Sequence, residues 1–222
     1  MKKIRRTLLI FLLLLLAGGG FYFSHRKGNT TPISDQEVHL NTLVTVTLYG
    51  TDRTELLDGA FALCDHYEKL FSRTLPESEI YRLNHGEISE VSPETSELIQ
   101  IGLSYGELSE GAFDISIEPV SSLWDFTSGN AVIPDEKELA EAVALVDYRK
   151  VHVNGNTVTF DTPGMGLDLG AIAKGYIADR IKEYLKKEGV EHALINLGGN
   201  VLCLGDKPEG TAFRIGVQKP FG

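Results

Sequence analysis

The sequence predicts an α+β protein with a mixed, largely antiparallel sheet and packed helices. Helical and strand patterns follow one another without strict β–α alternation, and tight turns join several short strands. The chain has 222 residues, of which 42% are hydrophobic, so it can bury one sizeable core. We therefore expect one soluble domain, preceded by a different kind of N-terminal segment.

That N-terminal segment combines basic and apolar residues. Residues 1–6 carry the basic side chains and are expected in the cytoplasm. Residues 7–23 form an apolar run, short for a membrane span and long for a signal-peptide core. An uncleaved anchor is favoured over a cleaved signal because no clean small-x-small site follows. Residues 24–35 are then a polar tether, and the domain at 36–222 is expected outside the cytoplasm at the cell membrane.

Charge and cysteine content limit the possible partners. The net charge of −10 argues against a nucleic-acid partner, because the domain has no basic stripe to neutralise phosphates. Cys64 and Cys203 fit no metal-ligand spacing. Two buried free thiols are the favoured interpretation, and a disulfide between them is permitted but not indicated.

The first half of the domain begins with a strand pattern. Alternating residues predict a strand over Glu37–Tyr49, and an apolar stripe predicts a helix over Thr54–Phe71. Ser78 is placed to cap a short helix over Glu79–Asn84. A second capping serine, followed by proline at the first helical position, predicts a helix from Ser92 to about Ser109.

The next elements are shorter. The segment from Gly111 to Phe126 is expected to be irregular. Pro134-Asp135 begins a helix to about Val146, and Asn154-Gly155 predicts a hairpin turn within 151–160. A final strand is expected over Phe213–Gln218.

The stretch from Leu167 to Gly205 organises the rest. Leu167-Asp168-Leu169 is predicted to end a strand, and a helix with one apolar stripe is predicted from about Ala171. Gly189 is the left-handed closing residue that such a helix needs. Two short strands are expected around Gly198-Gly199.

The start of this helix is a candidate anion site. Lys174 lies in the first turn, where a cation opposes the helix dipole, and Gly170 leaves room for a ligand beside Asp168. Free backbone N–H groups and a lysine together suit a phosphate. A plain strand-turn-helix with a solvated lysine explains the pattern equally well. Neither a dinucleotide fingerprint nor a nucleotide P-loop is present, because Leu169 and Gly175 stand at the wrong places.

A second candidate lies in the irregular segment. Small residues lead into Phe113 and Asp114, which could present a ring and a carboxylate to a ligand. Taken alone, a loop packed by its own aromatic residues is favoured.

The chain resembles the ApbE family, the FAD:protein FMN transferases, in four motifs that keep their order and spacing: FSRTLPESEIYRLN, GAFDISIEPVSSLWDF, LDLGAIAKGYIAD and ALINLGGNVLCLG. The resemblance extends over Glu37–Gly222. It implies Mg²⁺-dependent cleavage of the FAD pyrophosphate, with transfer of FMN to a threonine hydroxyl of an extracytoplasmic acceptor redox protein and release of AMP. A metal and a lysine would neutralise the developing charge.

The resemblance also implies site residues. Lys174 would approach the FAD phosphates, and the backbone carbonyl of Ala171 would bind Mg²⁺. Leu40 replaces a methionine that members often have, and Thr74 replaces an aromatic residue. The positions that would contact FAD are Leu40, Thr74, Ala112, Phe113, Asp114, Asp168 and Lys174.

The sequence lacks a histidine-rich segment and an Asp/Thr cluster that the family carries further on, so we expect an N-terminal portion of a member, incomplete at its C-terminus. Two alternatives to the transferase remain. The chain could be a catalytically incomplete FAD-binding module, or an FAD pyrophosphatase that yields FMN and AMP.

Overall fold

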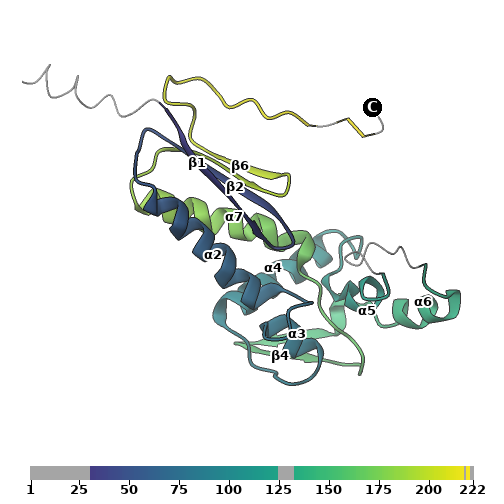
Figure 1. The fold of residues 1–222 in the computed structure, drawn as a ribbon. Coiled ribbons are helices and arrows are strands. Elements are labelled where there is room, and N and C mark those ends of the chain that lie inside the picture. Colours follow the sequence, from purple (N-terminus) through teal and green to yellow (C-terminus); the bar gives the residue numbers. More distant parts are fainter. Residues whose placement is uncertain (1–30, 125–132, 218, 221–222) are drawn as a thin grey trace, which may run out of the picture.

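The computed structural model describes residues 31–124, 133–217 and 219–220 (Figure 1). The predicted basic segment at 1–6 and the apolar run at 7–23 lie outside this range. Among the described residues, no helix combines the length and apolar character that crossing a bilayer requires. Strand β1 begins at Ile33, so the last residues of the predicted tether belong to the folded domain.

A four-stranded antiparallel sheet forms the upper part of the molecule. Its strands are β1 (Ile33–His39), β2 (Thr42–Tyr49), β5 (His192–Leu197) and β6 (Asn200–Leu204), in the spatial order β1-β2-β5-β6. This confirms the predicted fold class of helices with a largely antiparallel sheet.

The prediction of one strand over Glu37–Tyr49 is wrong. The chain reverses at Leu40 and Asn41, which have φ of 54° and 55°. Asparagine tolerates this left-handed conformation, but leucine rarely adopts it. The alternating pattern therefore gave no sign of a turn at this point.

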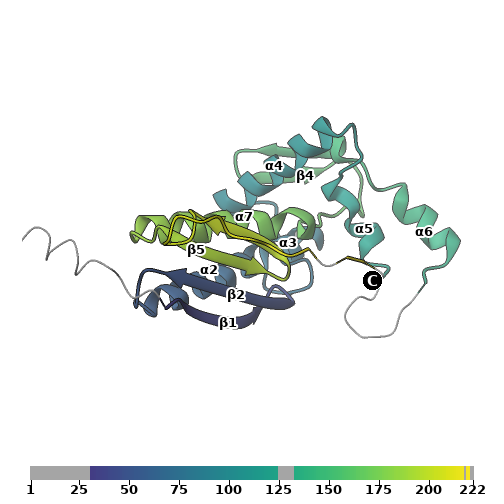
Figure 2. The ribbon, with the colours of Figure 1, turned by 90° about the horizontal axis from the view of Figure 1, so that it is seen from above.

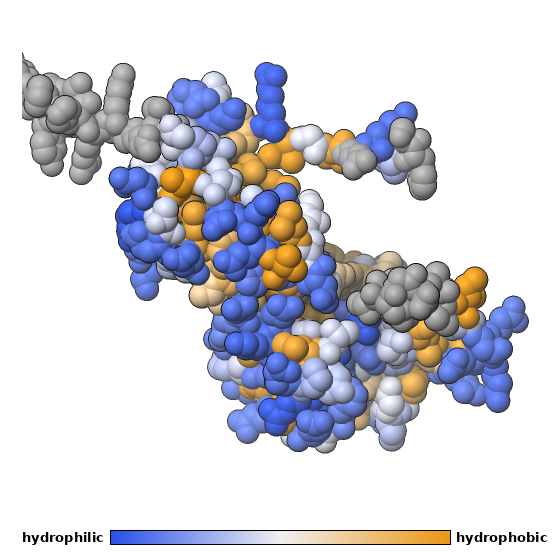
Figure 3. Space-filling model, viewed as in Figure 1, coloured by the Kyte–Doolittle hydropathy of each residue, from blue (hydrophilic) through white to orange (hydrophobic). Residues whose placement is uncertain are grey.

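Two helices, α2 (Glu55–Phe71) and α7 (Gly170–Lys187), pack along the sheet (Figure 2). Both were predicted, including the end of α7 at Gly189, where φ is +84°. The sheet residues facing the helices are fully buried: Val44, Val46, Leu48, Ala193, Ile195 and Leu197. Figure 3 shows a largely hydrophilic surface around this core, as expected for an acidic domain in water.

The lower part of the molecule contains the shorter elements. Ser78, Ser92 and Asp135 cap their helices with side-chain oxygens, as their sequence patterns predict. The elements are α3 (Glu79–Asn84), α4 (Pro93–Leu108), η1 (Ile115–Ile117), α5 (Glu118–Ser121), α6 (Glu136–Val143), η2 (Tyr148–Lys150), β3 (Val151–Asn154) and β4 (Thr157–Phe160).

Two predicted strands are absent from the described residues. Leu167 and Leu169 are buried, but the backbone of Leu167 and Asp168 bonds to Asn84 and Ile115 instead of a neighbouring strand, and Leu169, with ψ of 2°, already leads into α7. Phe213 to Val217 also forms no strand and runs past the sheet (Figure 1). A segment with alternating apolar residues forms a strand only where a partner strand is available. The sequence pattern of the segment does not show whether that partner exists.

Both cysteines are free, as predicted, but only Cys64 is buried. Burial raises the pKa of the Cys64 thiol to about 12. Cys203 is exposed because it lies on the sheet face that α2 and α7 do not cover.

Candidate functional site

A pocket of about 460 Å³ opens where the start of α7 meets the turn between β1 and β2. The loop after α2 and the turn between β5 and β6 complete its walls. Four of the residues predicted to contact FAD lie in this one pocket. The lining residues are Leu40, Asn41, Thr42, Glu68, Phe71, Ser72, Arg73, Thr74, Asp168, Gly170, Ala173, Lys174 and Gly198.

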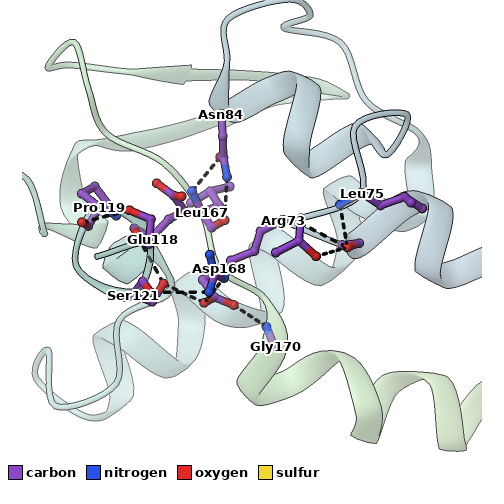
Figure 4. A network of polar contacts seen from close by, with 12 residues as sticks. Arg73, Leu75, Asn84, Glu118, Pro119, Ser121, Leu167, Asp168 and Gly170 are labelled. Carbon is purple, nitrogen blue, oxygen red and sulfur yellow. Dashed lines mark hydrogen bonds and ion pairs between the residues drawn. The ribbon is translucent and has the colours of Figure 1, made fainter. Parts of the chain in front are cut away.

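The Asp168 carboxylate ties three parts of the chain together (Figure 4). Arg73 Nε lies 3.0 Å from Asp168 Oδ2, and the Ser121 hydroxyl donates to the same oxygen at 2.8 Å. The other oxygen, Oδ1, accepts from the backbone N–H of Gly170 at 2.9 Å. Both oxygens are therefore engaged within the protein, and Asp168 positions the wall of the pocket.

The backbone around Asp168 is held by the lower part of the molecule. The Asn84 amide donates to the carbonyl of Leu167 at 2.9 Å and accepts from its N–H at 2.8 Å. The Asp168 N–H donates to the carbonyl of Ile115 at 2.8 Å. These bonds replace the ladder of the strand that the sequence predicts here, so the carboxylate stays fixed without a sheet.

Lys174 is half-buried in the pocket wall. Its ammonium makes no hydrogen bond or ion pair with any described residue, so its charge is available to a ligand. The free N–H groups predicted beside it are fewer than expected. Gly170 donates to Asp168, and the N–H groups of Ile172 and Ala173 both donate to the Leu169 carbonyl. The lysine rather than the helix backbone thus supplies most of the attraction for an anion.

The opposite wall consists of two tight turns. Leu40 and Asn41 form the first, and Gly198, with φ of +61°, begins the second. The Gly198 N–H donates to the Leu43 carbonyl at 3.1 Å, and a methyl group at Gly198 would clash with Thr42. Glycine is therefore required for the close approach of these turns.

The predicted residues Ala112, Phe113 and Asp114 do not line this pocket. Asp114 Oδ1 accepts from the N–H and hydroxyl of Ser116 at 2.8 and 2.7 Å, and Oδ2 accepts from the Tyr148 N–H at 2.9 Å. The Phe113 ring lies 6.2 Å from that of Tyr105. In the described residues Asp114 supports η1, whose Ile115 in turn holds Asp168.

Glu118 lies close behind the site. Burial raises the pKa of its carboxyl, the nearby Asp168 raises it further, and Arg73 opposes both. Its Oε2 also lies where a side chain at Gly166 would project. Arg73 thus pairs with Asp168 and acts on the Glu118 carboxyl through its charge alone.

Comparison of the whole chain with known proteins identifies its family. The family model described as the ApbE family matches residues 40–222.

The chain belongs to the ApbE family.

Individual ApbE relatives agree with this assignment. The FAD:protein FMN transferase of Klebsiella pneumoniae (strain 342) is 38% identical over 179 residues, covering 78% of this chain and 54% of the relative. That of Treponema pallidum (strain Nichols) is 30% identical over 211 residues, covering 85% and 58%. The chain therefore spans about half the length of the curated ApbE relatives that it matches.

Solved ApbE structures share the fold. The flavin transferase ApbE from Vibrio cholerae superposes with a TM-score of 0.79 at 26% identity, covering 86% of this chain and 65% of that one. The ApbE protein from Thermotoga maritima gives a TM-score of 0.78 at 28% identity, covering 86% and 65%.

Sequence reasoning missed several residues that lie in or beside the pocket. Arg73 lies beside Thr74 in the motif FSRTLPESEIYRLN, and this position was the only signal in the sequence that indicated Arg73. Ser121 likewise lies in the second motif, but its bond to Asp168 spans 47 positions and has no local pattern. Glu68 was not recognised as a pocket residue because a glutamate in a helix usually lies on the face exposed to solvent.

The described residues offer only part of a Mg²⁺ site. Mg²⁺ favours six oxygen ligands in octahedral geometry. The Ala171 carbonyl lies in the first turn of α7, but the neighbouring Asp168 carboxylate is already bound by Arg73, Ser121 and Gly170. Ala171 would therefore supply one ligand, and water or other groups would have to supply the others.

Proposed function

We propose that the protein takes part in moving FMN from FAD to a threonine hydroxyl of an acceptor redox protein, with release of AMP. In this reaction the threonine oxygen attacks the phosphorus of the FMN half. The pyrophosphate P–O bond breaks, AMP leaves with the bridging oxygen, and the hydroxyl proton passes to a base. Membership of the ApbE family and the names of the relatives support this proposal.

The observation that carries the proposal is the unpaired Lys174 in the pocket wall. A pyrophosphate carries negative charge that increases on the leaving phosphate, and an ammonium held in a partly desolvated wall stabilises that charge. Arg73 supplies less, because Asp168 already neutralises it at 3.0 Å. Leu40 and Thr74 would contact the remaining parts of the FAD molecule in the pocket.

We place Asp114 in a supporting role in this proposal, and Ala112 and Phe113 stay predicted contacts of FAD. Asp114 holds η1, and η1 holds Asp168 through the carbonyl of Ile115. Mg²⁺ belongs to the proposal as well, with Ala171 as one ligand, and it would neutralise phosphate charge when bound. We further propose an extracytoplasmic domain anchored in the cell membrane by residues 7–23, with the N-terminus inside, on the basis of the charge pattern.

The test combines two readouts on the same mixture. The purified protein is incubated with FAD, Mg²⁺ and a threonine-bearing acceptor. AMP is measured by chromatography, and covalent flavin on the acceptor is measured by in-gel fluorescence. The proposal expects both products, each dependent on Mg²⁺. AMP without labelled acceptor would favour the pyrophosphatase, and FAD binding without AMP would favour a binding module.

Substitution of Lys174 tests the site itself. Lys174→Ala should lower AMP release by about 100-fold or more, since removing one charge-stabilising group typically costs 10²–10³ in rate. Lys186→Ala is the matched control, because this exposed lysine lies in the last turn of the same helix. Equal AMP release by the two variants would remove Lys174 from the reaction.

A further inference from the structure

A nearly buried histidine ends strand β1, outside the residues assigned above. The His39 side chain is only 8% exposed, and its ring stacks on Phe61 with centroids 5.8 Å apart and planes at 17°. Its Nε2 lies 2.9 Å from Glu37 Oε2, and its Nδ1 lies 3.1 Å from Asp65 Oδ1. Both ring nitrogens of a desolvated imidazole thus face carboxylate oxygens.

A neutral imidazole ring has only one N–H group to donate to these two carboxylates. A neutral imidazole has one N–H donor and one lone pair. If Nε2–H donates to Glu37, the Nδ1 lone pair faces an oxygen of Asp65 at 3.1 Å, so two acceptors meet with no donor between them. A metal ion between Nδ1 and Asp65 would use this lone pair and the carboxylate oxygen together.

Glu68 adds a third ligand group. It lies one helical turn after Asp65, so both carboxylates project from the same face of α2 towards His39. The ligand atoms of His39, Asp65 and Glu68 all lie within 4.8 Å of one another. Tetrahedral Zn²⁺ with bonds of about 2.0–2.2 Å needs ligand separations of roughly 3.3 Å, so a small rotation of the flexible Glu68 side chain would close the site.

We propose that His39, Asp65 and Glu68 form a binding site for a divalent first-row transition metal ion, best matched by Zn²⁺. One imidazole nitrogen and two carboxylate oxygens suit a borderline-soft ion, whereas Mg²⁺ prefers oxygen ligands alone. Glu37 holds the ring by accepting from Nε2–H, which fixes the tautomer with Nδ1 free for the metal. The fourth position is open to water.

The position of the site indicates what the ion would do. His39 directly precedes Leu40 and Asn41, which line the flavin pocket, and Glu68 lines it from α2. An ion bound here would fasten the β1–β2 turn to α2 at the pocket wall. The proposal therefore concerns a positioning metal distinct from the Mg²⁺ of the transfer reaction.

The test measures Zn²⁺ binding to the full 222-residue chain by competition with a chromophoric chelator, in a large excess of Mg²⁺ and without FAD. We expect one Zn²⁺ bound per chain. Asp65→Asn, at a side chain that is 60% exposed and therefore safe for folding, should weaken binding by more than tenfold. Glu37→Gln should weaken it by about 10- to 100-fold, as is usual when the partner of a ligating histidine is lost.

His152→Gln is the matched control. His152 also contacts a carboxylate, Asp161, at 2.8 Å, but this pair is exposed and has no third ligand. Zn²⁺ affinity should be unchanged in this variant and lost in His39→Gln. Failure of the wild-type protein to bind Zn²⁺, or equal affinity in the His39 and Asp65 variants and the wild type, would overturn the proposal. Nitrogen NMR that shows both ring nitrogens protonated in the presence of Zn²⁺ would also overturn it.

Discussion

Arg73 is the residue that connects the pocket to the rest of the site. Its guanidinium contacts Asp168 Oδ2 at 3.0 Å, and the two side chains are only 21% and 20% exposed. A pair this deep differs from a surface ion pair, because removal of one partner leaves the other charge poorly solvated. Arg73 therefore matters for the stability of the site more than for binding an anion.

We expect Arg73→Gln to lower the free energy of unfolding by about 1–3 kcal/mol, because the Asp168 carboxylate loses its countercharge. Urea denaturation measures the change. Arg82→Gln is the control, since Arg82 also pairs with a carboxylate, Glu87 at 3.5 Å, but the two side chains are 43% and 54% exposed. Arg82→Gln should leave stability nearly unchanged, and an equal effect of the two substitutions would contradict our account of the Arg73 pair.

Glu118 gives the second prediction, a pH dependence. Burial raises its pKa in the folded protein above the ordinary value of 4.5, with Asp168 adding to the rise and Arg73 opposing it. A carboxyl with a raised folded pKa favours folding below its unfolded pKa, and this contribution is lost as pH rises through the folded pKa. Glu118→Gln should thus be more stable than the wild type at pH 7, with the difference disappearing towards pH 4.

Thermal unfolding at pH 4, 5.5 and 7 measures this dependence. Glu77→Gln is a suitable control because Glu77 is exposed in the loop before α3. A stability difference between wild type and Glu118→Gln that is constant across the three pH values would show that the carboxyl does not titrate in this range.

Single residues also mark the limit of the sequence analysis. Asp168 and Lys174 could be selected because the aspartate precedes one predicted helix and the lysine lies in its first turn, where a cation opposes the dipole. Their partners Arg73 and Ser121 come from other elements, and only the three-dimensional structure brings them together. The structure also turned Asp114 inward, which its motif did not reveal.

At the scale of elements, helices and the two hairpins with glycine turns, at 151–160 and around Gly198-Gly199, were predictable, and the other strands were not. Helices α2 and α7 have local periodicity, and α4 has a capping serine followed by proline, so each carries its own signal in the sequence. A strand depends on its partner. The turn between β1 and β2 was missed, and within the part of the chain that the structure describes no strand forms at Leu167–Leu169 or at Phe213–Val217.

The close approach of the β1–β2 turn and the β5–β6 turn gives the third prediction. Gly198→Ala should destabilise the protein by about 2–4 kcal/mol, because alanine is strained at φ of +61° and its methyl group meets the Thr42 side chain. Gly199→Ala is the control, since Gly199 also has positive φ, +95°, but no atom lies within 4 Å of the added methyl group. The difference between the variants in urea denaturation isolates the clash, and equal losses would mean that the turns do not approach closely.

At the scale of the whole molecule, Leu167 is one of the points where the sheet and its helices meet the lower elements, beside contacts such as that of Tyr176 in α7 with Glu97 in α4. The Leu167 side chain is fully buried, and both of its backbone polar groups bond to the amide of Asn84, 83 positions earlier. Asn84 ends α3 in the lower part, while Leu167 leads into Asp168 and α7 under the sheet (Figure 4). The amide thus links the two parts at the position that sets the pocket wall.

Asn84→Ala tests whether this link makes the two parts unfold together. It leaves a buried N–H and a buried carbonyl without partners, at about 1–3 kcal/mol each, so we expect a loss of about 2–5 kcal/mol. The amide hydrogen of Leu167 should also exchange faster with solvent. Gln100→Ala is the control, because the exposed Gln100 amide bonds only the Ser96 hydroxyl, at 3.0 Å.

Fluorescence of the single tryptophan, Trp124, reports the lower part, and circular dichroism reports all helices. Coincident transitions in the wild type that separate in Asn84→Ala would establish the coupling, whereas coincident, unshifted transitions in both proteins would show that other contacts join the two parts.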